Sequence, residues 1–346
     1  MKTITQGLKT SRWGLRASRR GLMCACAAIA LTASLGPALD TAQADGHQMA
    51  ESLHFIIPGG AGGGWDGTAR GTGEALTEAG LVGQASYENM SGGGGGKAIA
   101  HIIETAAESD NVLMVNSTPI VIRSLQGVFP QSFRDLTPIA GTIGDYAALV
   151  VPADSDVETV ADLAEAYKAD PTSVGIAGGS VAGGMDHLVA ALVMKNAGAD
   201  PASVKYIPYD TGGPAMAGLL AGESQALSTG FSEAVGMADQ GQVRILCITA
   251  PERIDAAPDT PTCAESGAPG TAFVNWRGFF GAPGLDAEKA ETYAKMLGDV
   301  QETEAWEEVR SRNGWVNIYN PGSDFTAFLE AQETEIGDLM KELGFL

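Results

Sequence analysis

Residues 53–70, LHFIIPGGAGGGWDGTAR, decide the fold class of this chain. The apolar run at 53–57 predicts a short buried strand. A glycine-rich turn follows directly, and Trp65-Asp66-Gly67 opens the helix predicted after it. A strand, a glycine turn and a helix in this order are typical of an α/β protein.

The same alternation continues along the chain, and it predicts an α/β fold with mostly parallel sheets. Roughly the last sixty residues are chiefly helical, and their final helix has one apolar face. The predicted strands are 53–57, 85–88, 112–115, 139–151, 174–177, 205–207, 225–228 and 243–249, and the predicted helices are 97–108, 157–169, 185–198, 215–221, 286–300, 302–312 and 323–343.

A chain of 346 residues predicts two domains. The strands at 139–151 and 243–249 are each followed closely by proline, and 139–151 is too long for one sheet. We therefore expect these two strands to cross between the domains. Domain 1 then comprises 45–144 plus 250–346, domain 2 comprises 145–249, and a ligand lies in the cleft between them.

The first 44 residues have the features of a signal peptide. A basic head precedes an apolar run of about 15 residues, which is too short to be a permanent membrane anchor. Ala42-Gln43-Ala44 provides a small-residue cleavage site, so we expect cleavage after Ala44 and export to the periplasm. Arg19 and Arg20 are similar to a twin-arginine signal, and both export routes stay open.

The cysteines divide between the leader and the mature chain. Cys24 and Cys26 precede most of the apolar run, so we expect both to be removed with the leader. Cys247 and Cys263 remain, and two cysteines in an oxidising compartment are expected to form a disulfide. The alternative is a pair of buried free thiols.

The chain is strongly acidic, with a formal net charge of −21. The leader holds six of the 21 basic and one of the 42 acidic residues, which leaves 15 and 41 and a charge of −26. Such a charge argues against nucleic acid or anionic lipid as a partner. Any bound anion must therefore be held by local dipoles and a few arginines.

Four glycine-rich turns follow predicted strands. Glycine lets the backbone approach a ligand closely, and helix N-termini present free N–H groups that favour anions. One such turn alone could be only a tight connection, but four predict a cleft lined by backbone donors. They lie at 58–67, 91–96, 178–184 and 209–214.

Enzyme motifs are incomplete. The G-x-G-x-x-G match at 62–67, with Glu88 about 20 residues on, is similar to a dinucleotide fingerprint, but Trp65 fills the place where the pyrophosphate needs close approach. The glycine run before Lys97 lacks the Ser or Thr of a P-loop, and Ser180 lacks the closing glycine of a nucleophile elbow. We expect no catalytic residue, no cofactor and no metal, since the histidines lack metal-ligand spacing. His187 beside the third turn either contacts ligand or caps a helix.

Several segments resemble the periplasmic receptors of tripartite tricarboxylate transporters, the Bug family. The motif at 58–70 resembles PGG-x-D-x-x-AR of that family, and the resemblance continues in order through nearly the whole mature chain. The remaining matching segments are 144–146, 208–215, 249–253 and 258–262, and 277–283 is similar to the citrate-receptor branch.

The resemblance implies a type II periplasmic binding protein of Venus-flytrap form. Such a protein is a monomer without enzymatic activity that passes a citrate-like or C4-dicarboxylate ligand to a permease of large and small membrane subunits. A ligand-occupancy sensor for a membrane kinase and, less favoured, an exported α/β oxidoreductase remain alternatives. The implied ligand contacts are Gly60, Ala61, Trp65, Asp66, Asn116, Ser117, Thr118, Ser180, Val181, Ala182, Asp186, Tyr209, Gly213, Pro214, Ala215, Trp276 and Arg277.

Two charged residues have alternative roles. Arg277 can hold a second carboxylate through two parallel hydrogen bonds, which would favour ligands with more than one carboxylate, or it can form a salt bridge within domain 1. Asp66 would repel an anion that it faced directly. It either accepts the N–H of Thr68 or Ala69 as a helix cap, or it orients a water that donates to the ligand.

Overall fold

The computed structural model describes residues 48–346. The expected signal peptide at 1–44, its cleavage site after Ala44, and Cys24 and Cys26 lie outside the described residues. From residue 48 onward, no helix is both long and apolar enough to cross a membrane.

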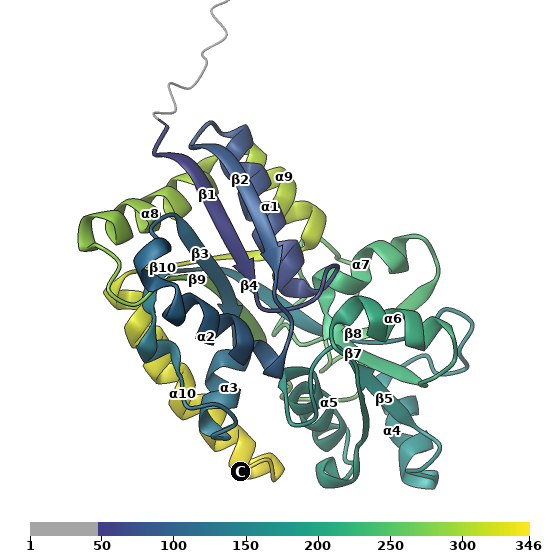
Figure 1. Cartoon of the computed structure of the whole chain (residues 1–346). Coiled ribbons are helices and arrows are strands. Elements are labelled where there is room, and N and C mark those ends of the chain that lie inside the picture. The colour runs from purple at the N-terminus through teal and green to yellow at the C-terminus, as the bar shows by residue number, and fades with distance from the viewer. Residues whose placement is uncertain (1–47) are drawn as a thin grey trace, which may run out of the picture. The chain divides into compact units, whose positions relative to one another are not determined.

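A first sheet is built mainly from the two ends of the described chain (Figure 1). β1 pairs in parallel with β2 and β3, whereas β9 lies antiparallel between β3 and the first part of β4. β10 is antiparallel to β4 on its other edge. The strands are β1 (Ala50–Ile57), β2 (Val82–Asn89), β3 (Val112–Ser117), β4 (Thr137–Pro152), β9 (Val274–Gly281) and β10 (Val316–Pro321).

A second sheet contains the middle of the chain. β5 pairs in parallel with β6 and β7, and the last part of β4 pairs antiparallel with β7 and β8. These strands are β5 (Gly175–Gly178), β6 (Lys205–Pro208), β7 (Ala226–Gly230) and β8 (Val243–Ile248). Both sheets are thus mixed, with parallel pairing at β1 and β5 and antiparallel pairing at β4 and β9, rather than mostly parallel as expected. In the first sheet the antiparallel pairs come from β9 and β10, two strands that were not predicted, and in the second sheet they come from β4 running opposite to β7 and β8.

β4 serves both sheets, as expected for the first crossover strand. Tyr146 pairs with Val274 of β9, and the next residue, Ala147, pairs with Gly230 of β7. The second crossover is divided into two strands on the same edge of β4. β8 ends at Ile248 and β9 begins at Val274, and the residues between them form a long loop.

Helices cover both faces of the first sheet, so alternate strand residues enter separate cores. In β1, Phe55 belongs to the core beneath α1, α8 and α9, whereas Ile56 belongs to the core beneath α2, α3 and α10. These helices are α1 (Gly64–Glu78), α2 (Gly96–Glu104), α3 (Pro119–Leu125), α8 (Ala287–Asp299), α9 (Glu304–Asn313) and α10 (Ser323–Leu343).

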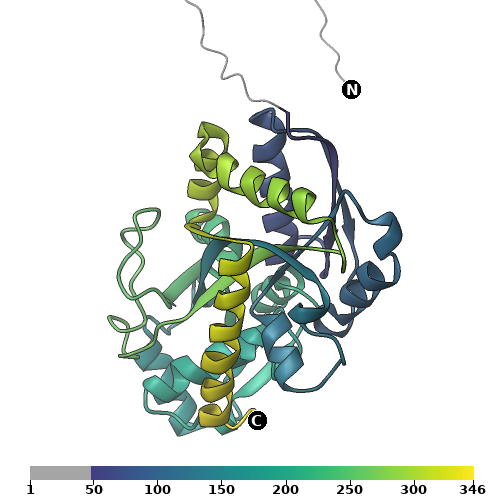
Figure 2. The same ribbon diagram turned by 90° about the vertical axis from the view of Figure 1, so that its left-hand side faces the viewer.

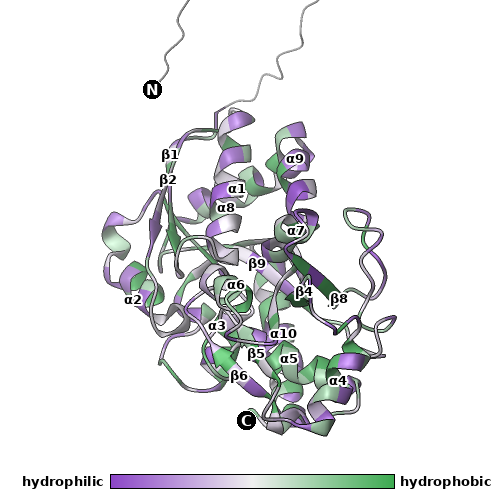
Figure 3. Ribbon diagram, turned by 90° about the vertical axis from the view of Figure 1, so that its right-hand side faces the viewer, coloured by the Kyte–Doolittle hydropathy of each residue, from purple (hydrophilic) through white to green (hydrophobic). Residues whose placement is uncertain are grey.

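The second sheet is also covered on both faces. Residues of α4 and α5 pack in one core, and residues of α6 and α7 pack in another against β4, β7 and β8. α5 and α6 are largely apolar in Figure 3, as expected for helices buried on a sheet. The helices are α4 (Val160–Ala169), α5 (Met185–Asn196), α6 (Gly212–Leu220) and α7 (Phe231–Asp239).

α10 connects the two sheets (Figure 2). Its bounds equal the predicted ones, because its apolar positions recur at helical spacing and Gly344 ends it in the left-handed conformation. Its first turn buries Phe325 in the first sheet's core, and beyond its last turn Phe345 packs edge-on against His187 of α5.

Cys247 of β8 and Cys263 of the loop between β8 and β9 form a disulfide, with their Cα atoms 4.7 Å apart.

Candidate functional site

The first glycine turn is held from behind by Asp66. The backbone N–H of Gly62 donates to Asp66 Oδ2 over 3.0 Å, and Gly62 has a positive φ of 79° that glycine adopts without strain. Asp66 Oδ1 also accepts from Arg70 Nε at 2.8 Å and Asn89 Nδ2 at 3.0 Å. Asp66 therefore fixes the turn, and its partners are other than the Thr68 or Ala69 N–H groups expected for it.

A cavity of about 80 Å³ lies between the loops of the two sheets. The first residues of α1, α5 and α6 border it, so the unpaired N–H groups and positive dipole ends of these three helices gather there, next to Pro119 at the start of α3. The lining residues are Gly59, Gly60, Gly63, Gly64, Trp65, Ser117, Pro119, Gly179, Ser180, Met185, Asp186, Asp210, Thr211, Gly212, Glu233, Asn275 and Arg277.

The two sides of the cavity approach each other closely because glycines, which have no side chain, lie where they meet. A Cβ added to Gly63 would lie 3.1 Å from Thr211 Cβ, and one added to Gly60 would lie 3.3 Å from Asp210 Oδ2. Ser91 Oγ also reaches both carboxylate oxygens of Asp210, at 2.7 and 2.8 Å. The turns of the first sheet thus contact the turns of the second directly.

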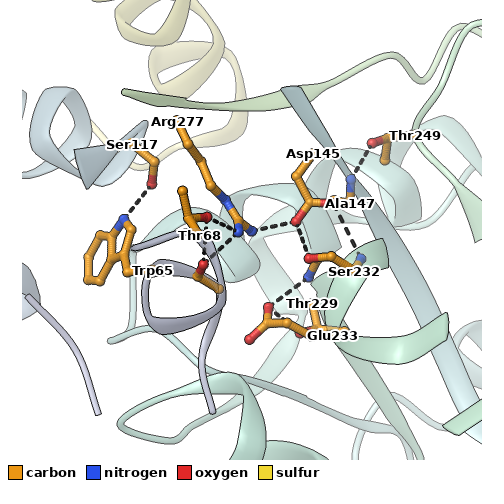
Figure 4. A network of polar contacts seen from close by, with 12 residues as sticks. Trp65, Thr68, Ser117, Asp145, Ala147, Thr229, Ser232, Glu233, Thr249 and Arg277 are labelled. Carbon is orange, nitrogen blue, oxygen red and sulfur yellow. Dashed lines mark hydrogen bonds and ion pairs between the residues drawn. The ribbon is translucent and has the colours of Figure 1, made fainter. Parts of the chain in front are cut away.

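The structure brings six of the expected contact residues to the cavity wall. Trp65 is fixed there by a hydrogen bond from its Nε1 to Ser117 Oγ at 2.9 Å (Figure 4). The six are Gly60, Trp65, Ser117, Ser180, Asp186 and Arg277.

The other expected contacts do not line this cavity. Ala61, Ala182 and Pro214 are exposed, and Val181 borders a neighbouring cavity. Ala215 packs in the core, and the Tyr209 hydroxyl donates to Glu223 instead. The remaining positions are Asp66 behind the first turn, Asn116 and Thr118 in the interior, and Gly213, whose added Cβ would lie 3.6 Å from the carbonyl oxygen of Gly62.

Strand alternation places Trp276 away from the cavity, although the family resemblance implied that it contacts the ligand. Successive side chains of β9 point to opposite faces of the sheet. Asn275 and Arg277 face the cavity, whereas Trp276 is only 1% exposed and packs edge-on against Phe325 and Phe328 of α10. No strand was predicted at 274–281, so the alternation of side chains between the two faces of a sheet could not be used to decide which of these residues faces the cavity.

Arg277 lies at the centre of a buried polar network (Figure 4). Its Nη2 donates to Asp145 Oδ2, and its Nη1 donates to the carbonyl oxygen of Gly64 and to Thr68 Oγ1, both at 2.6 Å. Arg277 is 2% exposed and Asp145 is fully buried. The structure contains the salt bridge of the second alternative, although its partner Asp145 lies one residue beyond the predicted end of domain 1 at 144, and Asp145 occupies the face expected to meet a second carboxylate.

Two further carboxyl groups border the cavity. Asp186, at the N-terminus of α5, is 6% exposed, and burial together with the neighbouring Glu233 raises its pKa to about 8. Burial also raises the pKa of Glu233, whose Oε2 accepts from Thr229 Oγ1 at 3.0 Å. The cavity thus combines positive helix ends with carboxyl groups that resist ionisation.

His187 supports the third glycine turn. Its Nδ1 accepts the N–H of Gly183 at 3.1 Å, and its ring stacks on Tyr206 at 4.5 Å between centroids. Burial lowers its pKa to about 4, so the imidazole is neutral at physiological pH. These contacts give His187 a structural role at the turn before α5, whose own N-terminus has no side-chain cap hydrogen bond. Within residues 48–346 no group of three or more His, Cys, Asp or Glu side chains could hold a metal ion.

Residues 70–345 match the sequence profile of the tripartite tricarboxylate transporter family receptor. The chain belongs to this family. It is 28% identical over 242 residues to a UPF0065 protein of Pseudomonas sp. (strain P51), a match that covers 69% of this chain and 70% of that protein.

Solved structures share the fold of this receptor. The periplasmic binding protein BugD superposes with a TM-score of 0.76 at 19% identity, covering 85% of this chain and 98% of that one. MatC of Rhodopseudomonas palustris, solved with bound malate, gives 0.73 at 18% identity, covering 84% and 98%. The family is the receptor family that the resemblance implied, and the fold is shared with the periplasmic binding protein BugD.

Several cavity residues were missed by the sequence analysis. Thr211 and Asp210 belong to a glycine turn that was recognised, and only the choice of residue within it was wrong. Glu233 and Asn275 lie outside every glycine turn. Glu233 follows a strand end at the start of α7, which is a general signal for a binding site in α/β proteins.

Proposed function

We propose that this receptor captures a small carboxylate in the cleft between its two sheets and delivers it to a tripartite tricarboxylate permease. The observation that carries the proposal is the cavity bordered by three helix N-termini in a chain of this family. Backbone N–H groups there can hold an anion even though the protein as a whole is strongly acidic.

We further propose that the two sheets correspond to two domains, 45–144 with 250–346 and 145–249, which close over the ligand. Bending would occur where β4 passes between the sheets and where β8 gives way to β9. The leader at 1–44 would direct the protein to the periplasm, where it would act as a monomeric, non-enzymatic receptor.

A role as an occupancy sensor uses the same cleft and the same closure. The fold match with MatC, solved with bound malate, supports a carboxylate ligand for either role. Deletion of the permease genes separates the two, because transport-dependent growth on the ligand is lost while a sensing response persists.

Binding is tested by calorimetry of the mature protein with mono-, di- and tricarboxylates, after mass spectrometry of ligand released from purified protein. Gly63→Val should weaken binding at least 10-fold, because its side chain would meet Thr211 and hold the two sides apart. Gly67→Ala is the matched control in the same segment, since a Cβ there meets nothing within 4 Å. Equal affinity in both variants, or no carboxylate bound by the parent, would overturn the proposal.

A further inference from the structure

The third glycine turn, at 178–184, contributes Gly179 and Ser180 to the wall of the cavity. Because glycine restricts the backbone little, such a turn needs contacts that fix its conformation. One contact comes from the second sheet, where the hydroxyl of Tyr206 in β6 donates to the carbonyl oxygen of Ser180 at 2.7 Å. Other contacts come from elements that pack on the first sheet.

Gly183 is held by both of its backbone groups. Its N–H donates to His187 Nδ1 at 3.1 Å, and its carbonyl oxygen accepts from Gln126 Nε2 at 2.9 Å. Gln126 directly follows α3, and its Oε1 accepts from Arg123 Nη1 at 2.7 Å, which fixes the side-chain amide. Gly183 has a positive φ of 74°, and a Cβ there would lie 2.8 Å from Gln126 Nε2. The turn is thus joined to α3 as well as to α5.

Two aromatic rings contact the imidazole of His187. Tyr206 stacks on it, and Phe345 packs edge-on against it with 4.8 Å between the ring centroids. Phe345 follows α10, whose last turn is joined to α5 by an ion pair between Glu342 and Lys195. These contacts fix the orientation of the imidazole, and hence the direction in which its Nδ1 accepts a hydrogen bond.

We propose that Phe345 and Gln126 are positioning residues for the ligand site. Phe345 fixes the ring of His187. His187 and Gln126 then fix the two backbone groups of Gly183, which keeps the third glycine turn in its binding conformation. Neither Phe345 nor Gln126 lines the cavity, so both act on a ligand only through this turn.

The inference rests on the proposed function, because a held turn serves a receptor only if the cavity binds a ligand. A turn that is not held must be ordered when the ligand binds, and the conformational entropy lost in this step weakens binding. Phe345 is only partly buried, so its truncation acts mainly on the turn rather than on the core.

Hydrogen exchange of the ligand-free protein tests the positioning without any ligand. Phe345→Ala and Gln126→Ala should each speed the exchange of the amide hydrogens at 179–186 by about 10-fold or more, and leave that of β1 unchanged. Phe345→Tyr, which keeps the ring, should restore the parent's rate. Phe328→Ala is the matched control, since Phe328 is a partly buried phenylalanine of α10 that packs on Trp276 instead. Parent-like exchange of the turn in both alanine variants would overturn the inference.

Calorimetry then measures the effect on binding, with malate, adipate and citrate as the probes. For each probe that binds the parent, the Kd should rise about 10-fold in Phe345→Ala and in Gln126→Ala. It should stay within about 2-fold in Phe345→Tyr and Phe328→Ala. Faster exchange of the turn with an unchanged Kd would overturn the role in ligand binding. If no probe binds the parent, the proposed function is contradicted, whereas faster exchange would still show that these residues hold the turn.

Discussion

Arg277 of β9 and Asp145 of β4 form a buried ion pair at the point where β4 leaves the first sheet for the second. β4 begins to pair with β7 two residues after Asp145. Asp145 also accepts a hydrogen bond from Ser232 Oγ, at the start of α7, over 2.7 Å. The pair therefore joins the first sheet, the first glycine turn and α7. Its position indicates a role in holding the cleft in shape.

Arg277→Ala should destabilise the protein by about 3 to 5 kcal/mol, because it leaves the Asp145 carboxylate buried without its partner. Urea unfolding of the ligand-free protein measures the loss. Arg312→Ala removes an exposed arginine paired with Glu74 and should cost less than about 1 kcal/mol. Equal stability of Arg277→Ala and the parent would contradict this role.

Gly64→Ala should be destabilising although alanine favours helices. A Cβ at Gly64 would lie 2.5 Å from Arg277 Nη2 and would disturb the hydrogen bond from Arg277 to the Gly64 carbonyl oxygen. Gly67→Ala, three residues on in the same helix, meets nothing within 4 Å and should stabilise by up to about 1 kcal/mol. We expect the melting temperature to fall in Gly64→Ala and to rise in Gly67→Ala. A higher melting temperature in Gly64→Ala would show that Arg277 moves aside at little cost.

Asp186 should make the empty receptor less stable as pH rises. Its pKa in the folded state is about 8, against 3.8 for an exposed carboxyl, because burial and Glu233 disfavour its charge. The folded state therefore holds the proton more tightly, so the stabilisation is complete below about pH 4 and is lost as pH rises to about 8.

Asp186→Asn should have a shallower pH dependence. The variant should match the parent near pH 4 and exceed it by about 2 to 5 kcal/mol near pH 8. The titratable and charged groups that face Asp186 are Glu233 of α7, Arg277 of β9 and Tyr206 of β6. The pKa values of Glu233 and Asp145 are also raised, so the variant keeps part of the parent's loss of stability with rising pH. Denaturant unfolding between about pH 4 and pH 8 measures the free energy of unfolding of both proteins. Parallel curves for variant and parent would contradict the role of Asp186 in the pH dependence.

Removing the Cys247–Cys263 disulfide should cost about 3 kcal/mol in the chain-entropy model, since the two residues are 16 apart in sequence. The expected result is a lower unfolding midpoint for the Cys247→Ala, Cys263→Ala double variant under oxidising conditions. Reductant should lower the midpoint of the parent and leave that of the variant unchanged. Two titratable thiols in denatured, unreduced periplasmic protein would show that the bond does not form there.

Elements with local signals were predicted well. α10 follows from apolar residues at helical spacing, and β4 from its length. β9 was missed because the polar residues Asn275 and Arg277 interrupt its apolar pattern. Both are tolerated in a central strand because one borders the cavity and the other has a buried partner in Asp145.

The sequence by itself determined the α/β class, the long crossover strand, the family and the glycine turns that border the cleft. These depend on periodicity and on backbone requirements that act within a few residues. Only the tertiary structure decided which charges remain available to a ligand. Asp145 and Arg277 are 132 residues apart in sequence, and their pairing depends on the register between β4 and β9. Within residues 48–346, the same folding places no carboxylate in an ion pair with Arg123, and this too depends on which groups burial brings together.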